Sequence, residues 1–510
     1  MQGVRRLLTA VRRLPWNRFF AGAIAGSAGL GLTLLLRFLG LGLFLPEQAV
    51  DFAVAVIPGE VESFFIQTMG GGAKVLAVLT AVFVFLALLG LFAVFYRRVE
   101  RLLKNRWLVI AFYTFATAAV TLLIIVPILG GGVAGMESRA GLGAAVFSQL
   151  LGAWLYASVL DYFLVDVAHR HPEGFSLSRR QFLAAGALAL GAVALTLWGL
   201  GSLVTRPGRL VFASVQEMFD REVTPNAGFY TVTKNLVDPE VDGDAWRLSI
   251  DGLVDRPSAR TYNEVAALAS ADEYVTLECV SNQVGGDLIS TAKWGGVRLR
   301  DLLDRAGPRP VADWVEFTCA DGYTVAVPMT RARHPQALLA VRMNDETLPR
   351  PHGYPARIVV PGLYGMFHAK WVTRITLRQG ETLGFWQQKG WTNRGEIRTT
   401  AILATPPADN VIRGPTTFGG IAFAGDRGIL AVEVSTDGGS TWQPATLKSP
   451  PLAGATWVLW TFDWDPSSSG AHQVVVRAVD GQGTAQERTP EPPFPKGASG
   501  YDELTLLVAL

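Results

Sequence analysis

The chain has 510 residues, 50% of them hydrophobic and only 17% charged, and its formal net charge at pH 7 is +2. This length predicts several domains, and the low charge, against about 25% in soluble domains, predicts a strongly apolar part. A nearly balanced charge without a basic stripe excludes a nucleic-acid partner. Two cysteines are too few for a disulfide framework.

Most of the apolar residues lie before residue 205, in five segments that each approach or exceed the roughly 20 residues a bilayer requires. These segments cover residues 20–45, 74–96, 107–130, 141–165 and 182–204. Arginine and lysine gather before the first, between the second and third, and before the fifth, whereas the alternate loops are acidic or nearly neutral. We therefore expect a multi-pass protein of the cell membrane, with a four-helix membrane domain over residues 1–175, a cytoplasmic N-terminus and an extracytoplasmic part after residue 205.

Two adjacent arginines precede the fifth apolar segment. The order Ser178-Arg179-Arg180-Gln181-Phe182-Leu183, followed by a run rich in Ala, Gly and Leu, resembles a twin-arginine export signal. Positive charge on the inner side of a membrane is the alternative explanation. We expect residues 176–205 to form a twin-arginine-like segment with a fifth membrane helix. The twin-arginine route carries folded cargo, so a domain exported by it could acquire a bulky cofactor in the cytoplasm before crossing.

Ionisable residues are sparse in the predicted membrane helices. None of the six histidines falls in them, so we predict no haem held by paired helix histidines. Asp161 and Asp166 lie near the inner end of the fourth segment, where we expect solvation at the membrane interface. The simplest interpretation of these helices is an anchor.

From residue 206 onward the chain is β-rich, with turn signals about every ten residues. Helical spacing over residues 297–306 ends at Gly307-Pro308, which stops a helix. We expect an α+β domain over residues 206–400. Short alternating segments bounded by Gly, Pro, Ser or Asp then predict an all-β immunoglobulin-like sandwich over residues 401–510. The expected fold class is thus multi-domain: all-α membrane helices, an α+β domain and an all-β sandwich.

Two strings of residues carry chemistry. Cys279 ends a β-rich run. Two functional roles fit it, a nucleophile or a thiolate ligand to a soft metal. The alternative is a buried small hydrophobic residue, as most free cysteines are. The string from His352 to Trp371 places two histidines, Arg357 and Lys370 among glycines and prolines. Such residues bind phosphate, and a solvated loop is the alternative.

Over residues 220–495 the chain resembles the sulfite-oxidase-like molybdopterin oxidoreductases. Several ordered motifs carry this resemblance: Cys279 with Asn282, Ser290-Thr291-Ala292-Lys293-Trp294-Gly295-Gly296, Leu348-Pro349-Arg350-Pro351-His352-Gly353-Tyr354-Pro355-Ala356-Arg357 with a following Pro-Gly-x-x-Gly, and Lys370-Trp371. The segment from Glu433 to Trp442 is similar to the family's dimerisation domain, which implies a homodimer.

The resemblance implies a molybdenum–molybdopterin cofactor and specific roles for residues of this chain. Cys279 would be the thiolate ligand of molybdenum, and Trp294 and Tyr323 would line the substrate pocket. The residues implied to contact the cofactor are Tyr230, Thr231, Cys319, His352, Arg357, His368, Ala369 and Lys370. For Cys319, a place in the hydrophobic core is an equally good interpretation.

The chain departs from sulfite oxidases where these bind their dianionic substrate with arginines. Val284 stands five residues after the ligand cysteine in place of one arginine, and Lys234-Asn235 replaces a second; Arg427 loosely matches a third. Lysine is a poor substitute for a bidentate guanidinium. We therefore expect a membrane-anchored oxidoreductase that transfers oxygen atoms with a sulfoxide-like or related small substrate and exchanges electrons with a cytochrome or quinone. The alternatives are a sulfite dehydrogenase feeding a cytochrome and a binding or sensor module that has lost its cofactor.

Overall fold

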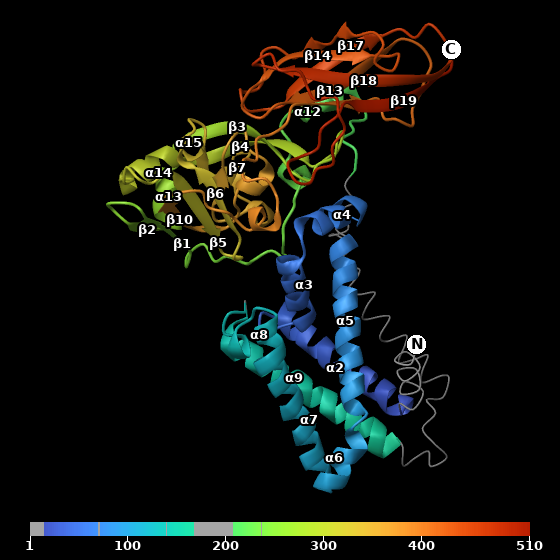
Figure 1. The fold of residues 1–510 in the computed structure, drawn as a ribbon, viewed down its shortest axis with the longest axis vertical. Helices are drawn as coiled ribbons and strands as arrows, with labels where there is room; N and C mark the ends of the chain where they lie inside the picture. Colours follow the sequence, from blue (N-terminus) through green and yellow to red (C-terminus); the bar gives the residue numbers. More distant parts are fainter. Residues whose placement is uncertain (1–14, 70–71, 139, 168–207, 236) are drawn as a thin grey trace. The chain divides into compact units, whose positions relative to one another are not determined.

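The structure is a computed structural model that describes residues 15–69, 72–138, 140–167, 208–235 and 237–510 (Figure 1). The chain divides into two compact units, one made of Met1–Val56 and Gly71–Thr205 and the other of Ile57–Gly70 and Arg206–Leu510. The fifth predicted membrane helix and the pair Arg179-Arg180 lie outside the described residues.

The first unit is helical, as predicted. Its helices are α2 (Trp16–Phe38), α3 (Leu45–Val56), α5 (Gly72–Ala93), α6 (Tyr96–Leu103), α7 (Arg106–Val120), α8 (Val126–Ile128) and α9 (Gly141–Asp161), with π-helical turns at Thr121–Ile125 and Tyr162–Val167. Within the described residues, four stretches suffice by length and composition to cross a bilayer: Trp16–Phe38, Gly72–Ala93, Arg106–Ile128 and Gly141–Asp166. The first helix begins and ends earlier than the predicted segment 20–45. Pro15 precedes its first turn, and Gly40, with a φ of 72°, follows its end.

Small residues let these helices approach closely. A Cβ atom added to Gly22 would lie 2.3 Å from the Cβ of Ala93 on α5, and one added to Gly29 would lie 2.7 Å from the carbonyl oxygen of Gly152 on α9. Larger side chains at these positions would force the helices apart.

The prediction that Asp161 is solvated was wrong. Its side chain is 1% exposed, and its carboxylate lies 2.5 Å from Nε of Arg106 and accepts a hydrogen bond of 2.5 Å from the hydroxyl of Tyr96. Asp166 pairs with the same guanidinium at 2.5 Å. A carboxylate is tolerated between packed helices when a cation and a donor compensate the loss of water.

The second unit contains the predicted α+β domain, built on two five-stranded sheets. One sheet has the order β2-β1-β10-β5-β6, with β1 (Arg247–Gly252), β2 (Ser258–Thr261), β5 (Trp314–Cys319), β6 (Thr324–Pro328) and β10 (Val372–Arg378). The other has the order β3-β4-β7-β8 with β9 paired to β7, and its strands are β3 (Ala271–Glu278), β4 (Ile289–Arg298), β7 (Leu338–Met343), β8 (Glu346–Thr347) and β9 (Arg357–Val359).

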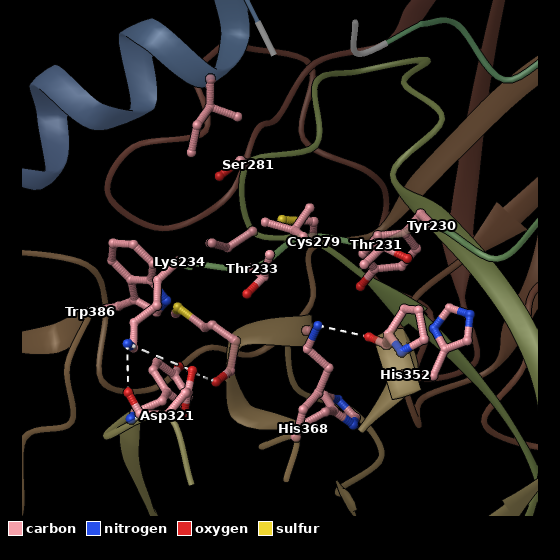
Figure 2. A pocket seen from close by; sticks show the side chains of 18 of the residues that line it. Tyr230, Thr231, Thr233, Lys234, Cys279, Ser281, Asp321, His352, His368 and Trp386 are labelled. Atoms are coloured by element: carbon pink, nitrogen blue, oxygen red, sulfur yellow. Dashed lines mark hydrogen bonds and ion pairs between the residues drawn. The ribbon is translucent and has the colours of Figure 1, made fainter. Parts of the chain in front are cut away.

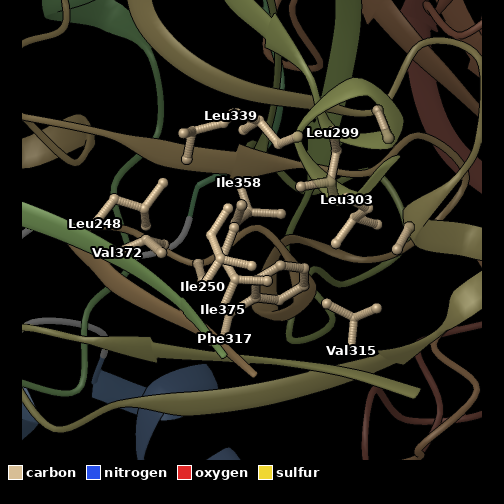
Figure 3. Packing of buried hydrophobic residues seen from close by; sticks show 14 of the residues in the cluster. Leu248, Ile250, Leu299, Leu303, Val315, Phe317, Leu339, Ile358, Val372 and Ile375 are labelled. Atoms are coloured by element: carbon tan, nitrogen blue, oxygen red, sulfur yellow. The ribbon is translucent and has the colours of Figure 1, made fainter. Parts of the chain in front are cut away.

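The α-helices of this unit are α4 (Gly59–Met69), α12 (Val215–Asp220), α13 (Tyr262–Leu268), α14 (Leu299–Ala306) and α15 (Met329–Ala332). The predicted helix over 297–306 is α14, which starts two residues later because β4 still pairs with β7 at Arg298. Short 3-10 helices lie at Asn226–Gly228, Arg350–His352, Gly365–Phe367 and Gln387–Lys389. The core of the domain joins α14 to both sheets, through buried Leu303, Phe317 and Leu339 among others (Figure 3).

The C-terminal part consists of two sheets that enclose a common core containing Phe418, Trp460, Val474 and Leu506. The first sheet is β11-β13-β17-β16, and the second is β12-β19-β18-β14-β15. Their strands are β11 (Thr400–Thr405), β12 (Val411–Ile412), β13 (Thr416–Phe423), β14 (Ile429–Ser435), β15 (Gln443–Pro444), β16 (Thr446–Leu447), β17 (Val458–Trp464), β18 (Gly470–Asp480) and β19 (Asp502–Val508). The β-rich character is as predicted, and the immunoglobulin-like assignment stays a prediction.

Candidate cofactor and active site

A cleft in the second unit holds about 900 Å³ of empty space, part of it open to solvent. Figure 2 shows Cys279 near its middle, with Tyr230, Thr231 and His352 to one side and Lys234, Asp321 and Trp386 to the other. We call the part formed by His352, Arg357 and Lys370 the cationic end, and the part formed by Lys234, Asp321, Trp386 and Trp391 the aromatic end.

Most of the residues predicted for the site line this cleft. They are Tyr230, Thr231, Cys279, Tyr323, His352, Arg357, His368 and Lys370. Trp294, Cys319 and Ala369 are buried and do not line it. The carbonyl of Ala369 accepts the N–H of Ile358 at 2.8 Å, and Cys319 packs in the core beside β10. These three residues therefore support the wall from behind.

Cys279 lies in a tight loop directly after β3. Its N–H donates to the carbonyl of Leu288 at 2.9 Å, and its carbonyl accepts the N–H of Asn282 at 2.9 Å. Asn282 closes the loop, because its side-chain oxygen accepts from the N–H of Leu288 and its amide donates to Glu278. The asparagine in the sequence motif thus holds the cysteine in place.

The thiol of Cys279 is in an environment that disfavours a free nucleophile. Burial raises the pKa of Cys279 to about 11, and burial also raises the pKa of the neighbouring Glu278 to about 7. A nucleophilic cysteine instead needs a nearby cation that lowers its pKa. A bound metal ion would supply that positive charge and displace the proton, so the position of Cys279 in the cleft is compatible with a ligand role.

Arg357 forms the floor of the cationic end. Its guanidinium is stacked 4.9 Å from the ring centre of Trp294, and its Nη1 donates to the carbonyl of His352 at 3.1 Å. Its Nε is buried without a hydrogen-bond partner among the described residues. Burial lowers the pKa of Arg357 to about 10, so the group remains charged at neutral pH. A buried guanidinium whose Nε–H has no hydrogen-bond partner among the described residues can bind an anionic group of a ligand.

The two histidines of the cleft are neutral. Nε2 of His352 lies 2.9 Å from the carbonyl oxygen of Asn226, and burial lowers the pKa of His352 to about 4. His368 uses both ring nitrogens, with Nε2 2.9 Å from the carbonyl oxygen of Leu363 and Nδ1 accepting the N–H of Val360, and burial lowers its pKa to about 3. His368 therefore braces the loop, whereas His352 keeps Nδ1 as an acceptor.

Close backbone approach shapes the middle of the cleft. A Cβ atom added to Gly365 would lie 2.5 Å from the hydroxyl of Tyr230, so a larger residue there would displace the Tyr230 side chain. The hydroxyl of Tyr323 donates to the carbonyl of Met366 at 2.6 Å. Lys370 donates to the carbonyl of Pro351 at 2.9 Å and lies 4.4 Å from the ring centre of Trp371. These contacts bring three separate segments of the chain to one wall.

Sequence reasoning missed several residues of the aromatic end. Asp321 lies 3.6 Å from Nζ of Lys234, Met366 and two tryptophans, Trp386 and Trp391, form apolar walls, and Glu62 and Ile66 of α4 also line the cleft. Asp321 lies two residues after Cys319, a predicted cofactor contact, so the sequence near Cys319 could have indicated it. The α4 residues carried none, since they lie far away in sequence.

These residues fit a pterin-bound metal. Among the described residues, no group of three or more His, Cys, Asp or Glu side chains is arranged to hold a metal ion alone. Cys279 offers one soft ligand facing the cleft, and Arg357 offers an unsatisfied buried donor at the cationic end. A metal whose other ligands come from an anionic organic cofactor matches this set.

Comparisons with known proteins agree with this site. The oxidoreductase molybdopterin binding domain matches residues 235–386, and the Mo-co oxidoreductase dimerisation domain matches residues 395–491. Sulfite oxidase of Gallus gallus is 32% identical over 309 residues, covering 51% of this chain and 67% of that protein. Mitochondrial sulfite oxidase of Mus musculus is 31% identical over 319 residues, covering 53% of this chain and 58% of that protein.

Among solved structures, the sulfane dehydrogenase SoxCD from Paracoccus pantotrophus aligns with a TM-score of 0.49 at 24% identity, over 56% of this chain and 84% of that chain. The chain spans 58% of the length of the mouse and human sulfite oxidases that it matches. Together, the domain matches and the site define a molybdopterin-binding oxidoreductase. This chain belongs to the sulfite-oxidase-like family of molybdopterin-dependent oxidoreductases.

Proposed function

We propose that this protein is a membrane-anchored molybdenum-cofactor enzyme that exchanges an oxygen atom with a small, uncharged, sulfoxide-like substrate on the outer face of the membrane. The observation that carries the substrate class is the pairing of Lys234, the lysine at the aromatic end, with the carboxylate of Asp321 at 3.6 Å. A dianion would have to compete with that carboxylate, whereas an uncharged group would not.

The chain's own residues would hold the cofactor at defined atoms. Sγ of Cys279 would bind the metal, Arg357 and Lys370 would face the anionic groups, and Nδ1 of His352 would accept a hydrogen bond. When bound, the cofactor supplies two-electron oxygen-atom transfer. Met366, Trp386 and Trp391 would exclude water and seat the apolar part of the substrate.

Two positions compared with sulfite oxidases support the same substrate class. Val284 is half-buried and does not line the cleft, so no arginine fork is contributed there. The guanidinium of Arg427 binds Asp480 at 2.8 Å and the carbonyl of Ile397 at 3.0 Å, which leaves it a structural role outside the cleft. Nothing in these contacts compensates a doubly charged substrate.

Sulfite oxidation is the second candidate, and the curated relatives named sulfite oxidase favour it. Lys234 would then be the cation offered to the substrate at the aromatic end of the cleft. In either case a cytochrome or a quinone would exchange electrons with the site, and the C-terminal domain would form a homodimer, as the name of the matching dimerisation domain suggests.

The location is also a proposal. It is supported by the alternation of basic and acidic loops in the sequence and by the four bilayer-length apolar helices. A folded export route through the segment that contains Arg179 and Arg180 would allow the cofactor to be inserted before the domain crosses.

The test uses the full chain, purified in detergent and assayed for molybdenum and pterin. Reduction of dimethyl sulfoxide by a reduced dye is compared with oxidation of sulfite by ferricyanide. We expect kcat/KM for sulfite to be roughly a hundredfold lower than kcat/KM for dimethyl sulfoxide. The reason is that this cleft lacks about 3 kcal/mol of charged hydrogen bonding to a sulfite dianion. Efficient turnover of micromolar sulfite would contradict the substrate class, and purified protein without molybdenum would contradict the cofactor.

A further inference from the structure

Helix α4 (Gly59–Met69) lies in the sequence between the first two bilayer-length helices, yet it belongs to the compact unit that carries the cleft. Its first residue packs tightly: a Cβ atom added to Gly59 would lie 2.6 Å from the carbonyl oxygen of Lys389 and 3.0 Å from Nε1 of Trp391. In Figure 2 the blue helix runs past the upper side of the cleft. The loop expected between two membrane helices is therefore part of the site.

Two side chains of α4 line the cleft, Glu62 and Ile66. The carboxylate of Glu62 lies 3.9 Å from Nζ of Lys389, and these side chains are only 14% and 8% exposed. Charges this well buried interact more strongly than surface charges, because little water screens them.

The pair formed by Glu62 and Lys389 is linked to the pair at the aromatic end. Nζ of Lys389 lies 4.5 Å from the ring centre of Phe385, and Nζ of Lys234 lies 5.5 Å from the same centre. Lys234 is in turn paired with Asp321. Two ammonium groups thus lie near one aromatic ring, each is paired with a carboxylate, and the formal charges cancel.

We infer that α4 determines substrate preference: the carboxylate of Glu62 offsets the charge of Lys389 and so weakens the attraction of anions to this side of the cleft, and Ile66 provides apolar contact for an uncharged substrate. This inference rests on the proposed function and deepens it, since it assigns the substrate class to a helix outside the matched molybdopterin domain at 235–386. The alternative is that α4 only fastens the cleft unit to the helical unit, in which case its charge has no effect on ligands.

The first experiment measures inhibition of dimethyl sulfoxide reduction by sulfate, a dianion that is not a substrate, in the full cofactor-loaded chain. Removal of the carboxylate in Glu62→Gln should lower the inhibition constant of sulfate roughly three- to tenfold. Glu60→Gln is the matched control, because Glu60 is exposed on the same helix and does not line the cleft. Equal inhibition constants in Glu62→Gln and the parent chain overturn the inference.

The second experiment needs no turnover. Cys279 of the cofactor-free full chain is alkylated by iodoacetate, an anion, and by iodoacetamide, a neutral reagent of nearly the same size, and the modified peptide is quantified. The ratio of the iodoacetate rate to the iodoacetamide rate reports the charge in the cleft. A general change in the accessibility of Cys279 affects both rates equally and leaves this ratio unchanged. It should rise about three- to tenfold in Glu62→Gln, fall in Lys389→Gln and stay constant in Glu60→Gln.

These outcomes separate the two proposals. A ratio that moves as expected in a protein that reduces no sulfoxide leaves the role of α4 intact and contradicts the proposed reaction. A ratio that is the same in Glu62→Gln, Lys389→Gln and the parent chain contradicts the role of α4, whatever the substrate proves to be. A misfolded variant is recognised because both reagents then react faster together.

Discussion

Nζ of Lys234 lies 3.6 Å from the carboxylate of Asp321, and both side chains line the cleft that also holds Cys279. Lys234 further donates to the backbone carbonyl of Asp321 at 2.9 Å and to the side-chain oxygen of Asn235 at 3.0 Å. Lys234, which we predict to stand where sulfite oxidases have a substrate-binding arginine, is therefore already paired with its neighbours. A charge held in this way attracts an incoming anion only weakly.

Removing the carboxylate partner should expose the charge of Lys234 to ligands. We predict that Asp321→Asn tightens inhibition by sulfate about five- to tenfold while the KM for dimethyl sulfoxide changes less than twofold, as expected for loss of one nearby charge. Inhibition constants from steady-state kinetics measure this. The double variant Lys234→Gln/Asp321→Asn should return to the parent value, and a persistently tight inhibition there would show that Lys234 is not the cation involved.

The sulfur of Cys279 should be essential for turnover but not for holding the pterin. We predict that Cys279→Ser lowers kcat by more than about a hundredfold, because a hydroxyl is a much harder ligand than a thiolate. Its pterin content, measured by fluorescence after oxidation, should stay near the parent level, since the cationic end is intact. Cys319→Ser is the control: Cys319 does not line the cleft, so that variant should lose thermal stability rather than kcat.

The stacked guanidinium at the cationic end should decide cofactor retention. We predict that Arg357→Lys reduces the pterin bound after dialysis roughly tenfold, because an ammonium group neither stacks on Trp294 nor supplies the unsatisfied Nε donor. Trp294→Phe keeps an aromatic face and should cost less than Arg357→Lys. Full retention of the pterin in Arg357→Lys would place the anionic groups elsewhere.

Stability should fall in mild acid because two buried histidines resist protonation. Burial lowers the pKa of His352 to about 4 and that of His368 to about 3, from an ordinary value of 6.5. Below pH 6.5 these two histidines bind protons in the unfolded chain but remain neutral in the folded chain. The stability that is present above pH 6.5 is therefore lost as the pH falls toward 4. Each histidine contributes about 1.4 kcal/mol per pH unit in this window.

The measurement is the unfolding temperature of the cofactor-free chain between pH 4 and pH 7. His352→Gln should flatten the decline, because one of the two titrating groups is gone. His472→Gln is the control for loss of an imidazole outside the cleft, since His472 lies on β18 and its ring contacts the carbonyl of Ser468. An identical slope in His352→Gln and the parent chain would exclude His352 as a cause.

Export should depend on the arginine pair before residue 182. If the twin-arginine interpretation holds, replacing Arg179 and Arg180 by lysine leaves the C-terminal domains inside the cell, because lysine preserves the positive charge but not the paired guanidinium groups. Protease accessibility of these domains in intact cells measures their location. Normal exposure in the double variant would show that ordinary charge asymmetry directs this segment.

Local patterns predicted the elements and most of the cleft. Apolar runs of bilayer length marked the four long helices, and the spacing before Gly307 marked α14. Cys279, His352 and Arg357 line the cleft and lie within motifs rich in glycine and proline, so these residues of the candidate site can be predicted from short stretches of sequence. The neutral state of the histidines cannot, because it depends on burial by distant segments.

The sequence by itself determined the order of the domains, the family and the cysteine that faces the cleft, since each depends on periodicity or on residues close together along the chain. Only the tertiary structure decided that Asp161 is buried against Arg106, that Trp294 supports Arg357 from behind, and that Lys234 is paired with Asp321. It also placed Glu62, from a loop between two apolar helices, beside Lys389. Charges more than 50 residues apart along the chain affect one another only once folding brings them together and removes the water between them.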